Sequence, residues 1–252
     1  MGKRPLVRRR GRGGMQFRAA VTGKLKPAKY PSFDLDETRQ GEIIDLVHET
    51  GRDAPLSKVR FEEGSISFIP AILGTKVGSK IDFGLESEIK EGNVISIQNI
   101  PDGTIVCNVE KQFGDGGTLI KSAGGDATVF SHTDNGVVLK LASGKFTKLN
   151  PKNRAMIGTL AGGGVTDRPL MRAGVAWRRF RSKGQKYPIV RGVAQAAYVH
   201  PHGGGRHQHV GQSSTVSRNA PPGAKVGSIA ARKTGRARIK ERKPVSYTHL
   251  RA

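Results

Sequence analysis

Charge is distributed along this 252-residue chain in three blocks of alternating sign. Residues 1–33 carry 10 Lys and Arg and no acidic residue, residues 34–150 carry 12 against 18 acidic residues, and residues 151–252 carry 21 against 2. The blocks therefore have net charges of +10, −6 and +19, and the chain has +23. Because like charges repel each other in a compact fold, we expect a polyanion to neutralise the two basic ends. Nucleic acid is the first candidate, an anionic membrane the second, and the acidic substrate of a basic enzyme the third.

The apolar content of the chain limits the size of its hydrophobic core. Apolar residues make up 36% of the sequence and aromatic residues 6%, while 34 residues are glycine. We therefore expect part of the chain to be extended or ordered only by a partner. Cys107 is the only cysteine, which excludes an internal disulfide and fits a reducing cytosol. No apolar run approaches the roughly 18 residues of a bilayer-spanning helix, and the basic N-terminus lacks the apolar stretch of a secretory signal.

The acidic centre of the chain has the pattern of β structure. Short runs rich in Val, Ile and Phe, such as ISFIPAIL, NVISIQNI and GVVLKLASG, are separated by turn sequences such as PDG, GDGG and DNG. Strands that recur about every ten residues favour small antiparallel barrels. Residues 131–149 are predicted to form a β-meander with tight turns at Asn135-Gly136 and Ser143-Gly144. The apolar residues of these runs are interpreted as core.

The two basic ends differ in their expected structure. Residues 1–33 contain Gly, Pro and clustered Arg with no apolar period, so they are expected to be irregular when free. The second end begins near Asn150, and its stretch DRPLMRAGVAWRRFRSKG could hold a helix with Asp167 as N-cap and Pro169 in the first turn. The residues beyond that helix contain too little apolar material for a core, which makes sense if another molecule orders them. We expect that deleting residues 1–33 or 192–252 weakens nucleic-acid binding and leaves the β core folded.

Four of the seven histidines lie in the stretch YVHPHGGGRHQH, residues 198–209. H-x-H followed by H-x-H matches no common zinc spacing, and no cysteine or carboxylate is nearby. General-base catalysis would need an orienting carboxylate, and the second basic end holds only Asp167 and Glu241. The glycine-rich stretch GDGGTLIKSAGG fits neither a P-loop nor a dinucleotide fingerprint. Packing of imidazoles and glycines against RNA is favoured, and the alternative is a histidine-dependent enzyme or metalloprotein that acts on nucleic acid.

A series of collinear motifs resembles one known protein family. In chain order they are NIPDGTIVCNVE, GDGGTLIKSAGG, VVLKLASGKFTKLNPKNRAMIGTLAGG, RAGVAWRRFR, and PIVRGVA followed by HPHGGG. Together they resemble the universal second protein of the large ribosomal subunit. The stretch GGGRHQHVGQSSTVSRNAPPGAKVGSIAARKTGR is similar to the archaeal and eukaryotic branch of that family rather than to the bacterial one. The resemblance extends from near the N-terminus to about residue 240.

The resemblance implies a mainly β fold with four parts: a basic extension at 1–34, an OB-fold barrel at 35–90, an SH3-like β-barrel at 91–175 and a long irregular basic extension at 176–252. It implies a structural, non-enzymatic protein that binds rRNA early in assembly and supports subunit association, tRNA binding and the peptidyl-transferase region. The implied partners are large-subunit rRNA, neighbouring ribosomal proteins and the small subunit, with no membrane and no small-molecule substrate. No cofactor or metal is expected beyond Mg or K ions held through RNA, and the expected location is the cytoplasmic ribosome.

Arginine clusters and the histidine stretch supply the expected RNA contacts, because Arg binds phosphate bidentately and stacks on bases. The resemblance places Arg191-Gly192 and His200 to Gly205 on the extension that approaches the catalytic RNA, and His200 matches the family histidine proposed to support peptide-bond formation. The full set of expected contacts is Arg8, Arg9, Arg10, Arg12, Arg18, Arg154, Arg172, Trp177, Arg178, Arg179, Arg181, Arg191, Gly192, His200, His202, Gly203, Gly204, Gly205, Arg206, His207, Arg218, Arg232, Lys233 and Arg236.

Three residues depart from the family pattern R-G-x-A-M-N-x-x-D-H-P. Gln195, Ala196 and Val199 stand where that pattern has Met, Asn and Asp. His200 therefore lacks the carboxylate that usually precedes it. We interpret His200 as a contact near an RNA catalyst rather than as a catalyst in its own right. The ending PVSYTHLRA, residues 244–252, also departs from the basic pattern of this end of the chain.

Overall fold

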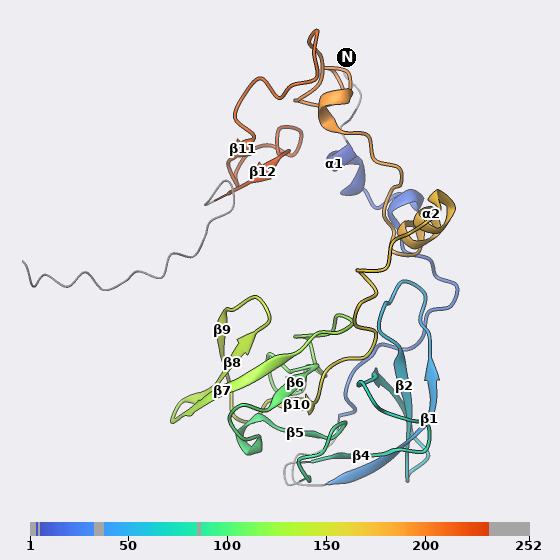
Figure 1. Ribbon diagram of the computed structural model, residues 1–252, viewed down its shortest axis with the longest axis vertical. Coiled ribbons are helices and arrows are strands. Elements are labelled where there is room, and N and C mark those ends of the chain that lie inside the picture. Colours follow the sequence, from blue (N-terminus) through green and yellow to red (C-terminus); the bar gives the residue numbers. More distant parts are fainter. Residues whose placement is uncertain (1–3, 5, 33–37, 85–86, 232–252) are drawn as a thin grey trace, which may run out of the picture. The chain divides into compact units, whose positions relative to one another are not determined.

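The computed structural model describes residues 4, 6–32, 38–84 and 87–231, which divide into two compact units (Figure 1). One unit comprises residues 19–187, and we name it the β unit. The other comprises the described residues up to Arg18 together with those from Pro188 onward, and we name it the basic unit. The mainly β class expected from the sequence is confirmed, because strands account for most of the regular structure.

Ten strands of the β unit form one continuous sheet. Their order across the sheet is β3-β2-β1-β4-β5-β10-β6-β7-β8-β9. Neighbouring strands are antiparallel except for the parallel pair β4 and β5. A short 3₁₀ helix, η2 (Ile97–Asn99), follows β5. The strands are β1 (Arg39–Val47), β2 (Leu56–Phe61), β3 (Ile66–Pro70), β4 (Lys80–Phe83), β5 (Val94–Ser96), β6 (Ile105–Cys107), β7 (Ala127–Thr133), β8 (Gly136–Leu141), β9 (Phe146–Leu149) and β10 (Arg154–Ile157).

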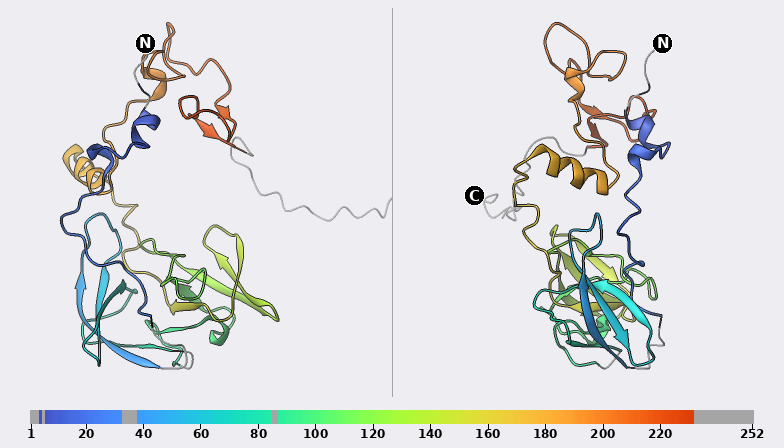
Figure 2. Two further views of the ribbon diagram at one scale, coloured as in Figure 1. Left: turned by 180° about the vertical axis from the view of Figure 1, so that it is seen from behind. Right: turned by 90° about the vertical axis from the view of Figure 1, so that its right-hand side faces the viewer.

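Two hydrophobic clusters lie within the β unit, the first around β1–β4 and the second around β6–β9. They are consistent with the OB-fold and SH3-like barrels that the resemblance implies, and Figure 2 shows the two groups of strands on opposite sides of the unit. The central strands serve both clusters, because successive side chains of a strand point to opposite faces. In β10, Met156 packs in the first cluster, whereas Ala155 and Ile157 pack in the second. Strand β5 divides Val94 and Ile95 in the same way.

The meander β7–β9 forms as expected, with one difference at its first turn. Thr133 pairs with Gly136, so the two loop residues are Asp134 and Asn135 and Gly136 begins β8. A Cβ at Gly136, whose φ is +141°, would lie 2.4 Å from the carbonyl oxygen of Leu149 in β9. Two features therefore require glycine at this position: the close approach of β9 and the positive φ of the backbone.

Helix α2 (Ala173–Ser182) lies within the predicted stretch but begins later than the sequence pattern predicts. Its N-cap position is Arg172, which has extended backbone and makes no side-chain cap. Asp167 instead closes a turn by donating its backbone N–H to the Gly164 carbonyl. The prediction of Asp167 as N-cap is therefore wrong. Pro169 contributes to the difference, because proline disfavours helical backbone at the residue before it.

The N-terminal segment is divided between the two units. Helix α1 (Leu6–Arg10) and the 3₁₀ turn η1 (Met15–Phe17) belong to the basic unit. Ala28 and Tyr30, in contrast, are each only 4% exposed, and Tyr30 belongs to the first hydrophobic cluster. The expectation that residues 1–33 can be deleted without harm to the β core is corrected accordingly, because residues near Tyr30 form part of that core.

The basic unit has little regular structure. Besides α1 and η1 it contains η3 (Gly192–Ala194) and two parallel strands of two residues each, β11 (Thr215–Val216) and β12 (Ser228–Ile229). Val226 is the one buried apolar side chain among its described residues. The prediction that this part of the chain lacks a hydrophobic core is confirmed. Across the described ranges of both units, no helix has the length and apolar content to cross a membrane.

Candidate nucleic-acid interface

A groove beside helix α2 brings together several of the expected basic residues. It lies within the β unit, has a volume of about 750 Å³ and is bounded by α2, the loop at 48–53 and the segment at 165–172. We name it the α2 groove. Its charged and histidine lining residues are His48, Arg52, Asp53, Arg168, Arg172, Arg178, Arg179 and Lys183, and its apolar lining residues are Val165, Pro169, Leu170, Met171 and Val175.

A charged contact fixes the C-terminal end of α2 to the loop at 48–53. The Asp53 carboxylate accepts a hydrogen bond of 2.7 Å from Lys183 Nζ and lies 3.6 Å from a guanidinium nitrogen of Arg179. The hydrogen bond from Lys183 outweighs the effect of burial and lowers the pKa of Asp53. Asp53 is therefore ionised at neutral pH, and it holds these two cations in place at one wall of the groove.

Three arginines of the α2 groove are left available for a ligand. The side chains of Arg168, Arg172 and Arg178 are exposed, and they form no hydrogen bond or ion pair with any residue that the structure describes. The guanidinium group is a planar fork that matches the oxygen atoms of a phosphate. Three such forks beside exposed apolar side chains fit a nucleic-acid strand, with its phosphates on the arginines and its sugars or bases on the apolar residues.

Trp177 and Arg181 form a second surface feature of α2, outside the groove. The Arg181 guanidinium carbon lies 4.9 Å from the centroid of the Trp177 ring, and Trp177 is 44% exposed. The two residues are four positions apart on the helix and so share one face. An exposed Arg–Trp pair provides a flat surface on which a base can stack. Both residues were expected as RNA contacts, and the structure brings them together.

Sequence patterns do not identify His48, Arg52 and Arg168 as residues of the α2 groove. His48 and Arg52 belong to the acidic central block, where the average charge hides local basic positions. Arg168 lies in the stretch that was interpreted as the start of the helix. A charge count over short windows would have grouped Arg168 with Arg172. The approach of the 48–53 loop to α2, in contrast, depends on tertiary contacts that no local pattern contains.

In the basic unit, residues 191–204 form a loop around His200, which we name the histidine loop. Nδ1 of His200 accepts a hydrogen bond of 3.0 Å from the backbone N–H of His202, and the Gly203 N–H donates to the His200 carbonyl at 2.9 Å. The imidazole packs on Gly192, where a Cβ would lie 2.3 Å from Cε1 of the ring. Gly192 and His200, which belong to one family motif, are therefore in direct packing contact.

Burial, followed by the neighbouring His202, lowers the pKa of His200 below its ordinary value. Because Nδ1 accepts a hydrogen bond, the proton of the neutral ring is on Nε2. The ring therefore presents an N–H donor to a partner rather than a free basic nitrogen. This arrangement favours the interpretation of His200 as a contact residue over a role as general base.

The departures from the family pattern leave the backbone of the histidine loop intact. A Cβ at Gly203 would lie 2.4 Å from the carbonyl oxygen of Gln195 and 2.5 Å from that of Ala196. The Gly204 N–H also donates to the Gln195 carbonyl at 3.1 Å. These contacts use main-chain atoms, so side-chain replacements at positions 195 and 196 do not remove them.

The histidines of this region do not converge on one point. The ring centroids of His200 and His202 are 5.0 Å apart, whereas Nδ1 of His209 donates to the His207 carbonyl at 2.6 Å. Over the ranges that the structure describes, no group of three or more His, Cys, Asp and Glu side chains is arranged to hold a metal ion.

The other expected contacts in the basic unit differ in their surroundings. Arg191 is exposed and donates to the Gln208 side chain at 2.9 Å. Three expected residues, Arg232, Lys233 and Arg236, lie outside the described residues. The remaining ones are exposed and comprise Arg8, Arg9, Arg10, Arg12, Arg18, Gly205, Arg206, His207 and Arg218.

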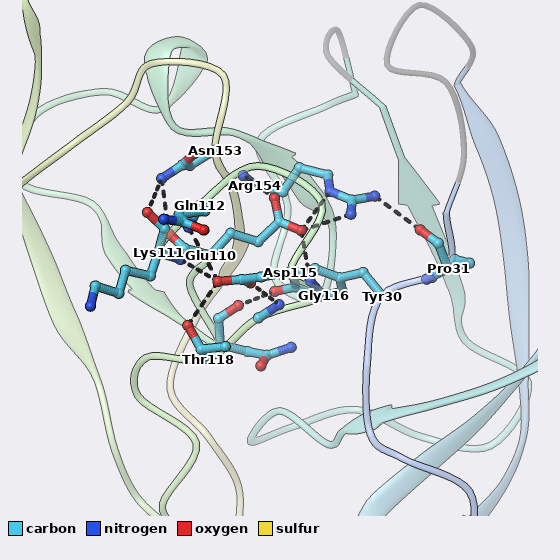
Figure 3. Close-up of polar contacts among 12 residues, drawn as sticks. Tyr30, Pro31, Glu110, Lys111, Gln112, Asp115, Gly116, Thr118, Asn153 and Arg154 are labelled. Carbon is cyan, nitrogen blue, oxygen red and sulfur yellow. Dashed lines mark hydrogen bonds and ion pairs between the residues drawn. The ribbon is translucent and has the colours of Figure 1, made fainter.

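Arg154 differs from the other expected contacts because its side chain is used inside the β unit (Figure 3). Its guanidinium donates to the Glu110 carboxylate at 2.7 and 3.1 Å and to the Pro31 carbonyl at 3.0 Å. Glu110 is fully buried and Arg154 is only 8% exposed. The guanidinium carbon also lies 5.4 Å from the centroid of the Tyr30 ring. We therefore assign Arg154 a structural role and no longer count it among the RNA contacts.

The β unit has two hydrophobic clusters, and the basic segments on either side of it in the sequence have almost no core. These features are those of a basic protein that binds a polyanion such as nucleic acid. The family model for "Ribosomal Proteins L2, C-terminal domain" matches residues 90–227. The large ribosomal subunit protein uL2 of Cenarchaeum symbiosum is 78% identical over 243 residues, covering 96% of this chain and 100% of the relative. The uL2 protein of Nitrosopumilus maritimus is 77% identical over 244 residues, with coverage of 96% and 100%. That of Sulfolobus acidocaldarius is 45% identical over 236 residues, with coverage of 94% and 98%.

The chain therefore belongs to the uL2 family of ribosomal proteins, in its archaeal form. The members of this family are structural components and not enzymes. The resemblance inferred from the sequence motifs is confirmed.

Proposed function

We propose that this chain is a structural constituent of the large ribosomal subunit that binds rRNA through the α2 groove and the basic unit. The observation that carries the proposal is a set of three exposed arginines around one groove, Arg168, Arg172 and Arg178, whose side chains have no partner among the described residues. The names of relatives that are 77% and 78% identical support the assignment to the large subunit. Family membership extends the proposal to early assembly, subunit association, tRNA binding and the peptidyl-transferase region. Neighbouring ribosomal proteins and the small subunit are the further partners, in the cytoplasmic ribosome.

The charge distribution supports the same function for the basic unit. Residues 151–252 hold 21 Lys and Arg against 2 acidic residues, and the described part from Pro188 onward has almost no apolar core. Contacts with phosphates would offset the repulsion among these cations. They would also stabilise the fold of the basic unit, as a hydrophobic core does in the β unit. If about ten phosphates are bound, log K should fall by roughly 7 to 9 per tenfold rise in salt concentration.

The test compares the triple variant Arg168→Gln, Arg172→Gln, Arg178→Gln with the control Arg60→Gln. Arg60 is also exposed, but it lies on β2 and pairs with Glu42 at 3.2 Å. Binding to transcribed fragments of large-subunit rRNA is measured over a series of KCl concentrations. We expect the triple variant to bind more weakly and to lower the slope of log K against log salt by about 2 to 3, or about one per lost phosphate contact.

The control should keep the affinity and the salt slope of the unchanged chain. Equal slopes for the triple variant and the unchanged chain would contradict phosphate binding in the α2 groove. Salt-insensitive binding of the unchanged chain would contradict the proposed function as a whole, because contacts with rRNA phosphates release counterions.

A further inference from the structure

The outer face of the β7–β9 meander carries an aromatic pair that the α2 groove does not use. Phe130 on β7 and Phe146 on β9 are 54% and 55% exposed, and their ring centroids are 4.9 Å apart with an interplanar angle of 64°. The opposite face of the same strands is buried, where Val129, Val137 and Leu139 pack in the second hydrophobic cluster. The two phenylalanine rings are therefore exposed to solvent, and the hydrophobic core of the meander does not use them.

Strand register places lysines beside the two rings. Lys140 of β8 pairs directly with Phe146, and Val138 pairs with Lys148. Residues directly opposite each other in an antiparallel pair share one face of the sheet. We name this surface the meander face, and it comprises Thr128, Phe130, Val138, Lys140, Phe146 and Lys148.

A β-bulge determines where Phe130 points. The register of β7 against β8 shifts between Val129 and Ser131, so Phe130 is the additional residue of the bulged strand. Bulges re-aim side chains and increase the local twist of a sheet. Here the bulge lies beside the position at which Phe130 meets the Phe146 ring in an edge-to-face contact.

The meander is a basic island in the acidic central block. Residues 127–150 contain three lysines, Lys140, Lys145 and Lys148, and one acidic residue, Asp134. Residues 34–126 contain 9 Lys and Arg against 17 acidic residues. Within the described residues, none of these three lysine side chains forms a hydrogen bond or an ion pair. The meander therefore has a net charge of +2, whereas residues 34–126 have a net charge of −8, and this local positive charge complements an anionic ligand.

We infer that the meander face is a stacking platform for unpaired bases of RNA, a second RNA site that rests on the proposed function. The exposed rings of Phe130 and Phe146 would stack with one or two bases, and Lys140 and Lys148 would bind the adjoining phosphates. Single-stranded RNA fits this surface because its bases are free to leave the helical stack. A duplex would present phosphates to the lysines but no base face to the rings.

A protein ligand fits the meander face less well than RNA does. Two rings expose far less apolar area than the roughly 800 Å² per partner of a stable protein interface, and lysine is depleted in such interfaces. Strand β9 is at the edge of the sheet, but it has only four residues, one of which is Lys148. Short, charged edge strands resist the addition of another strand.

The first experiment identifies the contact directly. The full chain is mixed with oligo(U) of about 12 nucleotides, together with excess duplex RNA that occupies sites which bind only phosphate. Ultraviolet cross-linking followed by mass spectrometry should find uridine adducts on Phe130 or Phe146. The groove variant Arg168→Gln, Arg172→Gln, Arg178→Gln should keep these adducts, because the two sites are separate. Absence of adducts on both phenylalanines, with adducts present elsewhere on the chain, would overturn the platform and leave the proposed function standing.

The second experiment separates stacking from apolar contact. The double variant Phe130→Leu, Phe146→Leu keeps the apolar character but removes the rings, while Phe146→Tyr keeps a ring. Under the same competition we expect the double variant to bind oligo(U) about 10-fold more weakly and Phe146→Tyr to bind as the unchanged chain does. Melting temperatures should agree among all three chains, because both side chains are more than half exposed. Equal binding by the double leucine variant would contradict base stacking and favour a protein ligand.

Discussion

At the scale of single residues, several glycines are needed because another segment of the chain packs directly against their backbone. The sequence pattern alone would class them as ordinary turn or loop residues. The His200 ring occupies the place of a Cβ at Gly192, the carbonyls of residues 195 and 196 do so at Gly203, and the Leu149 carbonyl does so at Gly136. In each case the obstructing group comes from another residue, and at Gly136 the positive φ of +141° is a second requirement for glycine. These glycines therefore act as spacers that let a second segment pack.

The contact between Gly192 and His200 gives a prediction about the histidine loop. Gly192→Ala would place a Cβ 2.3 Å from Cε1 of the ring, so the imidazole or the loop must move. We expect faster hydrogen exchange over residues 191–204, measured by mass spectrometry. The matched control is Gly223→Ala in the same unit, where the nearest atom lies at 3.9 Å and the exchange pattern should not change. Unchanged exchange in Gly192→Ala would contradict the packing.

The lowered pKa of His200 predicts a pH effect with a definite sign. Since burial and His202 disfavour the charged ring, the folded loop binds a proton less readily than the unfolded chain does. The contribution of neutral His200 to the stability of the loop is therefore fully present above the ordinary histidine pKa of about 6.5. This contribution is lost as the pH falls through the lower pKa that His200 has in the folded chain. An NMR titration of the His200 ring should give a lower pKa in the folded chain than in urea, and His202→Ala should raise the folded value.

At the scale of elements, strand β10 connects the two hydrophobic clusters and a buried ionic group. Its first residue, Arg154, donates through both backbone N–H and guanidinium to Glu110, and the guanidinium continues to the Pro31 carbonyl (Figure 3). The Gly116 N–H donates to the same carboxylate at 3.1 Å. The buried pair of Glu110 and Arg154 thus joins β10, the loop at 108–118 and the segment near Tyr30.

Breaking this buried pair should cost far more stability than breaking an exposed one. Glu110→Gln leaves the Arg154 cation buried without a charged partner, so we expect the free energy of unfolding to fall by about 3–5 kcal/mol. The control Glu42→Gln removes an exposed pair with Arg60 and should cost about 0–1 kcal/mol. Urea denaturation of the full chain measures both values. Similar losses for the two variants would show that the buried group is not a major contact of the fold.

At the scale of the whole molecule, the division into units does not follow the charge blocks. The first basic block ends at residue 33, but the β unit already begins at Ala19. Within the block, the backbone N–H groups of Lys29 and Tyr30 donate to carbonyls of Phe68 and Gly116 at 3.1 Å. Lys121 Nζ also donates to the Ala28 carbonyl at 2.6 Å. Part of a basic end is therefore a component of the core.

Two N-terminal deletions should consequently have different effects. Deleting residues 1–18 removes a segment of the basic unit, so the thermal transition of the β unit should remain and only rRNA binding should weaken. Deleting residues 1–31 also removes Tyr30 and the Pro31 carbonyl. Losing a buried aromatic side chain alone costs about 3–5 kcal/mol, so this shorter chain should melt at a clearly lower temperature. Calorimetry compares the two chains, and equal melting temperatures would contradict the core assignment.

Much of this molecule could be predicted from local patterns, and the failures share one cause. The mainly β class, the meander at β7–β9 and the absence of a core in the basic unit follow from residue types at short spacing. Asp167 was wrongly assigned as N-cap because local capping rules do not include the turn that it closes with Gly164. Arg154 was grouped with exposed arginines because its partner Glu110 lies 44 residues away in the sequence.

By itself the sequence determined the alternating charge blocks, the strand-forming centre, the family motifs and hence the polyanionic kind of partner. These properties depend on which side chains are present and on their spacing along the chain. The tertiary structure alone decided which arginines are available to a ligand and which one is buried, and it decided that residues near Tyr30 belong to the core. The physical reason is that burial and pairing depend on neighbours in space, such as Pro31 and Arg154, which are 123 residues apart along the chain.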